Sequence, residues 1–343
     1  MEKVSSSVEW IGNGGMNCHR RFERMLLPCQ QTKGKWGYID PQGRWKISPV
    51  FDYAAPFVEE GVAAVVWSQG KGLRSLIDRD GRFLFEPRPF EELTALTGTR
   101  ALAQNPKPVV IDSCGHEVWC PDCDDLQAAG CGLFVEWFDS WHRGRLVREG
   151  GVSIVNEEFR ELAVYAEKGY LLGRREDGYV LMDFNSNVLH AYSPDYEAIG
   201  PFDEKGLAIV TVRGLRGVMT KAEDIILPPI FREIDFCFGG EHFFVSCRTD
   251  EAENFKVYDV QSGEFLWGDF EYTAPAIDLD LFWGFAKGSW SLYRTDGRCL
   301  AHDVCTDLRM AVDGKYQGAV DENGQMFYVF FAEGCLARIF PAA

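Results

Sequence analysis

The chain has 343 residues, of which 46% are hydrophobic and 14% aromatic, a composition typical of folded and not of disordered proteins. Its formal net charge of −17 disfavours a nucleic acid as partner, because phosphate backbones are bound by Lys and Arg, and it suits a basic partner protein. We expect no membrane association and a cytoplasmic location, because no apolar run has the length of a membrane span and residues 1–31 lack the apolar region of a signal peptide.

One strand–turn–strand pattern recurs along the whole chain. In its clearest instance, residues 35–40 form a predicted strand that ends in Asp40, Gly43 closes a tight turn, and residues 44–48 form the next strand. Asp and Gly are the residues that such turns favour. The same pattern returns about every 35 residues, a period typical of repeat folds. It predicts nine anchor positions: Asp40, Asp78, Asp112, Asn156, Asp183, Thr220, Asp259, Arg294 and Asp321.

Each repeat parses into three strands: a short one of small or β-branched residues, the one that carries the anchor, and one after the turn. The aromatic linker to the next repeat could add a fourth, outer strand. The sequence therefore predicts an all-β repeat protein of about nine three- to four-stranded antiparallel units. These units would form a closed β-propeller-like ring or, as the alternative, an open β-solenoid or superhelical array.

The small residues of the first strands favour the ring, because propeller blades converge at a crowded centre. The last apolar strand, residues 335–340, could close such a ring by pairing with residues 24–27, which would remove two exposed edges. We assign residues 1–23 to an N-terminal extension and residues 24–343 to a single repeat domain.

The residues around the first anchor carry a family resemblance. The run Gly-Lys-Trp-Gly-Tyr-Ile-Asp at 34–40, followed by Gly43, Pro49 and Phe51, resembles one complete unit of the WG (or KWG) β-repeat family of bacterial proteins. The resemblance is clear over residues 34–66 and degenerate beyond them. It implies a bacterial repeat scaffold that mediates interactions and carries no catalysis, and it assigns no functional residue.

The Trp-Gly pair itself predicts packing. Trp36 can cover the neighbouring unit, while Gly37 lets a backbone or an aromatic ring approach closely. We expect the same role for small residues at the equivalent positions, which are Ser75, Ser153, Gly217, Ser291 and Gly318.

One group of cysteines could carry chemistry. Cys120 and Cys123 have the spacing of half a zinc knuckle, and Cys114, His116 or Cys131 could complete four ligands. The same Cys pair is similar to a thioredoxin-type redox motif, with Cys120 attacking and Cys123 resolving, but that motif must open a helix at residues 124–129. A second CxxC is missing, and scattered cysteines suit buried thiols in a reducing cytoplasm. We therefore expect neither metal nor cofactor, and keep zinc or thiol redox as an alternative.

The longest predicted repeat contains an aromatic run. Insertions in repeat proteins usually form loops on one face, often the binding face, and aromatic residues beside Arg are typical of interface hot spots. The candidate partner-binding residues are Trp137, Phe138, Trp141 and Arg143. Alternatively, the two Trp simply cover the core of an irregular unit.

The sequence contains no HExxH, GxSxG, Walker A or GxGxxG motif. We therefore expect a non-catalytic, cytoplasmic, protein-binding scaffold, in its most specific form an immunity or regulatory subunit that binds a partner protein. The alternatives are a ligand-binding or enzymatic propeller with a central-pore site, and a zinc or thiol-redox protein centred on Cys120 and Cys123.

Overall fold

The computed structural model describes residues 8–11, 25–31, 34–58, 61–67, 72–203, 205–238, 244–249, 253–276, 281–312, 316–332 and 335–341. In this described part of the chain, 35 strands form nine separate antiparallel sheets, and the helix η2 (Ala166–Lys168) is a single 3₁₀ turn. No helix among these residues is long and apolar enough to cross a membrane. The prediction of an all-β chain of nine antiparallel units is confirmed.

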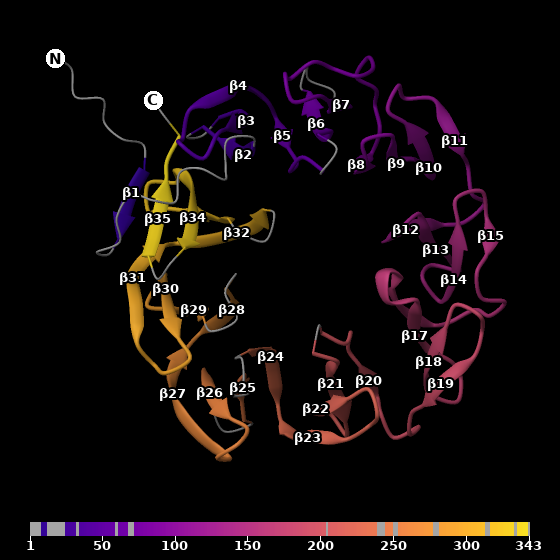
Figure 1. Ribbon diagram of the computed structural model, residues 1–343, viewed down its shortest axis with the longest axis vertical. Helices are drawn as coiled ribbons and strands as arrows, with labels where there is room; N and C mark the ends of the chain where they lie inside the picture. The colour runs from indigo at the N-terminus through magenta and orange to yellow at the C-terminus, as the bar shows by residue number, and fades with distance from the viewer. Residues whose placement is uncertain are drawn as a thin grey trace. The chain divides into compact units, whose positions relative to one another are not determined.

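The chain divides into two compact units, residues 1–89 with 235–343, and residues 90–234. The first unit holds five sheets (Figure 1). Their strands are β2 (Leu27–Gln30), β3 (Trp36–Ile39) and β4 (Trp45–Phe51); β5 (Tyr53–Ala54), β6 (Ala63–Trp67) and β7 (Leu73–Ile77); β24 (Glu233–Phe238), β25 (Phe244–Arg248), β26 (Phe255–Asp259) and β27 (Glu264–Phe270); β28 (Tyr272–Pro275), β29 (Leu281–Ala286), β30 (Ser289–Arg294) and β31 (Cys299–Cys305); β32 (Asp307–Val312), β33 (Tyr316–Val320), β34 (Met326–Ala332) and β35 (Cys335–Ile339), with β1 (Val8–Ile11).

The second unit holds four sheets of four strands each. Their strands are β8 (Glu92–Thr97), β9 (Arg100–Asn105), β10 (Lys107–Asp112) and β11 (Glu117–Trp119); β12 (Asp125–Gly130), β13 (Leu133–Phe138), β14 (Arg143–Arg148) and β15 (Val152–Ser153); β16 (Glu161–Tyr165), β17 (Tyr170–Arg174), β18 (Tyr179–Asp183) and β19 (Val188–Ala191); β20 (Ala198–Ile199), β21 (Leu207–Val212), β22 (Leu215–Thr220) and β23 (Ile225–Phe231).

The aromatic linker does supply a fourth strand. Tyr53 and Ala54 form β5, which pairs with β6, and the equivalent β20 pairs with β21. This strand lies at the edge of its sheet opposite the residues that follow the anchor turn. Six of the sheets are therefore meanders of four strands in chain order with the anchor at the end of the third, whereas in the last sheet the anchor Asp321 follows β33, the second of its four consecutive strands.

The anchor turn has one geometry in several sheets. Asp40 Oδ1 accepts hydrogen bonds from the backbone N–H of Gln42 and of Arg44, each at 3.0 Å, and the Asp40 carbonyl accepts from Gly43 N. Asp78, Asp112, Asp183 and Asp321 bond the residues two and four places later in the same way. The hydroxyl of Thr220 replaces the carboxylate in its own turn.

The predicted anchor at Asn156 is wrong. The turn in that sheet joins β14 to β15, and Gly151 N donates to the carbonyl of Arg148. Arg148 lies 36 residues after Asp112 and 35 before Asp183, so the repeat has ordinary length. Ser153, assigned from the same register, lies in β15 and not at the position of Gly37.

Gly37 allows the backbone of the adjacent strand β4 to approach closely. Trp36 pairs with Phe51 and Tyr38 with Ile47, so β4 bulges opposite Gly37. A Cβ at Gly37 would meet the Ile47 carbonyl oxygen at 2.4 Å, and one at Gly217 would meet the Leu227 oxygen at 2.5 Å. The predicted close approach is confirmed at both positions.

The hydrophobic clusters among the described residues each join two sheets. One cluster combines Tyr38 and Phe51 of the first sheet with Val65 and Ile77 of the second, and Trp36 packs against it. Trp36 also packs against a cluster shared by the first sheet and the β32–β35 sheet. The prediction that Trp36 covers a neighbouring unit is confirmed.

The last sheet takes a strand from the start of the chain. β1 pairs antiparallel with β35, from Val8 with Ile339 to Ile11 with Leu336, and the two strands lie side by side in Figure 1. This corrects the predicted closure by residues 24–27, because Leu27 begins β2 and pairs with β3. The strand comes from the segment that the sequence analysis assigned to an N-terminal extension.

Candidate functional site

The aromatic run lies in the second unit, on the hairpin that joins β13 to β14. The structure contradicts the predicted insertion loop, because the two strands pair without interruption from Leu133 with Arg148 to Phe138 with Arg143. Of the four candidate residues, Trp137 and Phe138 end β13, Arg143 begins β14, and Trp141 lies in the turn between them. The structure therefore places all four on one hairpin, as two pairs: Trp137 stacks with Trp141, and Arg143 lies over Phe138.

The hairpin turn holds Trp141 in a fixed position. Asp139, Ser140 and Trp141 all have positive φ angles, of 52°, 56° and 73°. Ser140 N donates to Asp124 Oδ2 at 3.1 Å. The ring Nδ1 of His142 donates to the Asp139 carbonyl oxygen at 2.6 Å. These bonds tie the turn to the strand ends beside it.

Two indoles form the centre of the site. Trp137 is 5% exposed and Trp141 is 52% exposed, and their rings stack with centroids 5.2 Å apart and an interplanar angle of 26°. Gly144 makes room for the buried ring, since a Cβ there would meet Trp137 at 2.6 Å. The buried indole belongs to the core and supports the exposed one.

Two arginines pack on Phe138, which contacts a different hydrophobic cluster from that of Trp137. The guanidinium carbons of Arg143 and Arg145 lie 5.8 and 5.5 Å from the centroid of the half-buried Phe138 ring. Arg143 also pairs with Asp139 and, at 2.9 Å, with Glu158, while Arg145 donates to the buried Glu136. The guanidinium groups are held by cation–π contacts to Phe138 and by ion pairs.

The cysteine region does not assemble the proposed ligand set. Within the described residues, one group has metal-ligating atoms within 4.8 Å of one another, formed by Asp112, Cys114 and His116. Cys120, Cys123 and Cys131 are not part of it. The group is an anchor turn. Hydrogen bonds to Asp112 from His116, which has the larger effect, and from Cys114 hold the pKa of the Asp112 carboxyl below its ordinary range.

The structure contradicts the thioredoxin-type interpretation of Cys120 and Cys123. Residues 125–130 form strand β12 and not the helix that a thioredoxin-type motif requires. Burial, then the charges of Glu136 and Asp125, raises the pKa of Cys123 to about 12, and its side chain lies in an apolar cluster. Burial and then Glu117 also raise the pKa of Cys120, which opposes the thiolate that an attacking cysteine needs.

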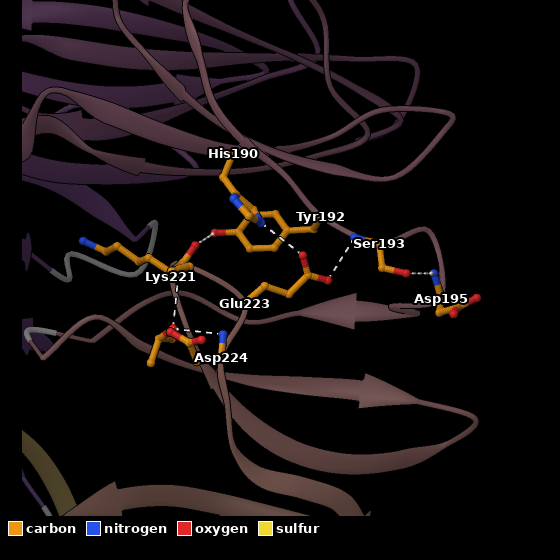
Figure 2. Close-up of polar contacts among 9 residues, drawn as sticks. His190, Tyr192, Ser193, Asp195, Lys221, Glu223 and Asp224 are labelled. Atoms are coloured by element: carbon orange, nitrogen blue, oxygen red, sulfur yellow. Dashed lines mark hydrogen bonds and ion pairs between the residues drawn. The ribbon is translucent and has the colours of Figure 1, made fainter.

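Sequence reasoning missed a polar network in the second unit. Glu223 lies 3.1 Å from His190 Nε2 and accepts from Ser193 N at 3.2 Å, and Tyr192 donates to the Lys221 carbonyl (Figure 2). Ser193, His190 and Glu223 are of the residue types that form a nucleophile–base–acid triad. However, the Ser193 hydroxyl accepts from Asp195 N and points away from the imidazole, so the network joins two sheets and activates no nucleophile.

Sequence reasoning also missed a cavity in the first unit. Its volume is about 460 Å³, and strands of three sheets line it, with Trp36, Tyr53 and Arg309 among the lining residues. Trp36 and Arg309 are more than 270 residues apart, so no local motif could reveal their proximity.

The profile of the WG containing repeat family matches residues 36–66 and 192–215. The first match starts at Trp36 and confirms the resemblance read from residues 34–66. The second lies in the degenerate part of the chain, where Gly200, Phe202, Gly206 and Ala208 follow the pattern of the first segment without its Trp-Gly pair. A comparison with curated proteins found no match.

Comparison with a solved structure supports the fold class. The crystal structure of the eukaryotic initiation factor matches with a TM-score of 0.61 at 10% identity, over 92% of this chain and 98% of that chain. BamB from Moraxella catarrhalis matches with a TM-score of 0.44 at 12% identity, over 83% of this chain and 96% of its own. At 10% identity, the likeness to the initiation factor is one of fold alone. With nine antiparallel sheets, the chain is of the nine-bladed β-propeller class, as predicted.

Proposed function

We propose that the protein is a non-catalytic scaffold that binds a partner protein through the β13–β14 hairpin. The observation that carries this proposal is the exposed Trp141, stacked on the buried Trp137 by a turn of fixed geometry. A large aromatic side chain that is already ordered loses little conformational entropy on binding. Trp and Arg are also the residues that dominate binding energy at protein interfaces.

The charges around Trp141 define the chemistry of the partner. Asp124, Asp139 and Glu158 surround the turn, and the chain as a whole carries a net charge of −17. The complementary surface is basic and has an apolar pocket that accepts an indole. Charge complementarity of this kind chiefly raises the association rate and is weakened by salt.

In its specific form, the scaffold is an immunity or regulatory subunit that neutralises or recruits one such partner in the bacterial cytoplasm. β-Propellers commonly serve as platforms for protein binding, which supports the general proposal. The eight described cysteines are free thiols, which suits a reducing compartment.

Differential capture tests the proposal. Wild type, Trp141→Ala and Tyr272→Ala serve as baits; Tyr272 is the matched control because it is 61% exposed but lies in the first unit. We expect a basic protein to be retained by wild type and Tyr272→Ala and lost from Trp141→Ala. With the purified partner, Trp141→Ala should raise Kd at least about 30-fold, the effect of a hot-spot residue.

Two outcomes would contradict the proposal. One is a partner that binds Trp141→Ala as tightly as wild type. The other is the absence of any stable protein partner together with turnover of a small molecule. Thermal melting of Trp141→Ala checks that the fold is intact, since truncation of a half-exposed ring should cost little stability.

A further inference from the structure

The cavity of the first unit has the features of a small-molecule site. Its volume of about 460 Å³ falls within the range of ligand pockets. We propose that it binds a small aromatic anion, such as an arylcarboxylate. This site lies in the other compact unit from the β13–β14 hairpin and does not depend on it.

The floor of the cavity is apolar and ordered. Tyr328 and Met326 of β34 and Ala54 of β5 line it, and they are 1%, 6% and 2% exposed. The Tyr328 hydroxyl donates to the Pro28 carbonyl at 2.6 Å, so this residue presents its ring and not its hydroxyl. An apolar floor of this kind accommodates a hydrophobic ring.

Two aromatic side chains form the wall. The rings of Trp36 and Tyr53 lie with centroids 5.6 Å apart at an interplanar angle of 58°. Tyr53 is 44% exposed and Trp36 is partly buried, so both are accessible from the cavity. A planar ligand can stack on one ring and meet the edge of the other, the geometry that aromatic pairs favour.

The polar lining selects the charge of the ligand. The described lining residues include one cation, Arg309, and no Asp or Glu, although acids outnumber bases in the chain by 52 to 35. Arg309 pairs with Asp307 at 2.9 Å, but both side chains are more than half exposed, so the pair is weak and a ligand carboxylate can compete for the guanidinium. Among the lining residues that the structure describes, a cationic ligand would find no carboxylate as counter-ion.

A buried side chain holds the backbone at Arg309. Gln317 is 9% exposed and donates from Nε2 to the Arg309 carbonyl oxygen. Gln30, also in the lining, is held by its own bond from Nε2 to the Gly34 carbonyl at 3.1 Å. The backbone that carries Arg309 is therefore anchored by a hydrogen bond, and its guanidinium lies at one side of the aromatic pocket.

Calorimetric titration of the full chain tests the proposal, with three probes. Indole-3-acetate carries the ring and the negative charge, tryptamine carries the ring with a positive charge, and acetate carries the charge alone. We expect indole-3-acetate to bind with Kd below about 1 mM and the other two to bind at least about tenfold more weakly.

Variants then locate the site. Arg309→Gln should raise Kd for indole-3-acetate at least about tenfold, because a hydrogen bond to a charged group is lost. Arg82→Gln is the matched control, since Arg82 is likewise exposed in the first unit and pairs with an acid two residues earlier, Asp80, at 3.1 Å; it should leave Kd unchanged. Tyr53→Ala should weaken binding through the loss of the wall.

Equal affinity for tryptamine and indole-3-acetate would overturn the proposal, as would an unchanged Kd in Arg309→Gln or the absence of binding by any aromatic probe. Binding that is the same in Tyr53→Ala and wild type would place the ligand elsewhere and would also overturn it. A loss of the hairpin's protein partner in Trp141→Ala would leave these results unaffected, so failure of one proposal is distinguishable from failure of the other.

Discussion

Gly37 shows how one residue type can be required by the close approach of a neighbouring strand's backbone. The bulge of β4 places the Ile47 carbonyl where a side chain at position 37 would begin. Ser at the equivalent position 75 meets the same need differently, since its hydroxyl is buried and donates to the Phe85 carbonyl at 2.7 Å. The Trp-Gly pair of the repeat is therefore explained by packing.

Gly37→Ala should destabilise the first unit by at least about 2 kcal/mol, because a Cβ 2.4 Å from a backbone oxygen forces the strands apart. Gly200→Ala is the control, because its nearest neighbour would be the Ile209 oxygen at 3.2 Å and a small shift relieves it. Denaturant unfolding of both variants gives the comparison. A Gly37→Ala protein as stable as Gly200→Ala would refute this explanation.

At the same scale, the sequence identified the residues of the hairpin but not their roles. Trp137 and Trp141 both appeared as candidates, since aromatic residues beside Arg can be recognised from sequence. Which indole is buried depends on strand pairing, because Gly144 opposite Trp137 provides the space for its ring. That pairing was obscured by the misplaced anchor.

At the scale of the element, the anchor turn at Asp40 is stabilised by hydrogen bonds and ion pairs to one ionised carboxylate. Burial of the Asp40 carboxyl opposes its ionisation, but the hydrogen bonds from Arg44 and Gln42 prevail and hold its pKa below the ordinary value. Arg44 and Lys46 also pair with this carboxylate. Asp40 is 3% exposed, whereas the Arg44 and Lys46 side chains are 64% and 48% exposed, so only the carboxylate end of each ion pair is buried.

A depressed pKa in the folded state has a defined effect on stability. The contribution of Asp40 is fully present above the unfolded-state pKa, near 4, and is lost as the pH falls through the lower folded-state pKa. Asp40→Asn should therefore reduce the free energy of unfolding at pH 7 by roughly 1–2 kcal/mol, through the loss of charged hydrogen bonds. The difference from wild type should shrink as the pH falls below about 4.

Asp80→Asn provides the control for that measurement, because Asp80 lies in the next anchor turn with its side chain 68% exposed. It should change stability little at either pH. A difference between Asp40→Asn and wild type that stays constant from pH 7 to acid would show that the carboxylate charge is not involved.

The anchor turns also explain where sequence reading succeeded and failed. Positions with Asp and a later Gly were found because their chemistry is local: the carboxylate bonds its own backbone. Arg148 occupies an anchor without that side-chain bond, so its turn gave no such signal and Asn156 was chosen in its place. One degenerate turn then produced an apparent long repeat and an insertion that does not exist.

For the whole molecule, period and strand pattern were enough to predict an all-β chain of nine units. Two features depend on residues distant in sequence and could not be predicted. The pairing of β1 with β35 joins residues more than 300 positions apart, and the 460 Å³ cavity draws its walls from both ends of the chain. In both cases the contacts exist only once the sheets are packed.

The scaffold proposal makes one claim that a single measurement addresses: the partner docks on the β13–β14 turn of the second unit. Hydrogen exchange of the free chain and of the complex, compared amide by amide, reports where the partner lies. We predict slower exchange in the complex for residues 139–143, with no change around Tyr272, which is 61% exposed against 52% for Trp141 but lies in the other unit. Unchanged exchange at residues 139–143, with protection elsewhere, would contradict the claim.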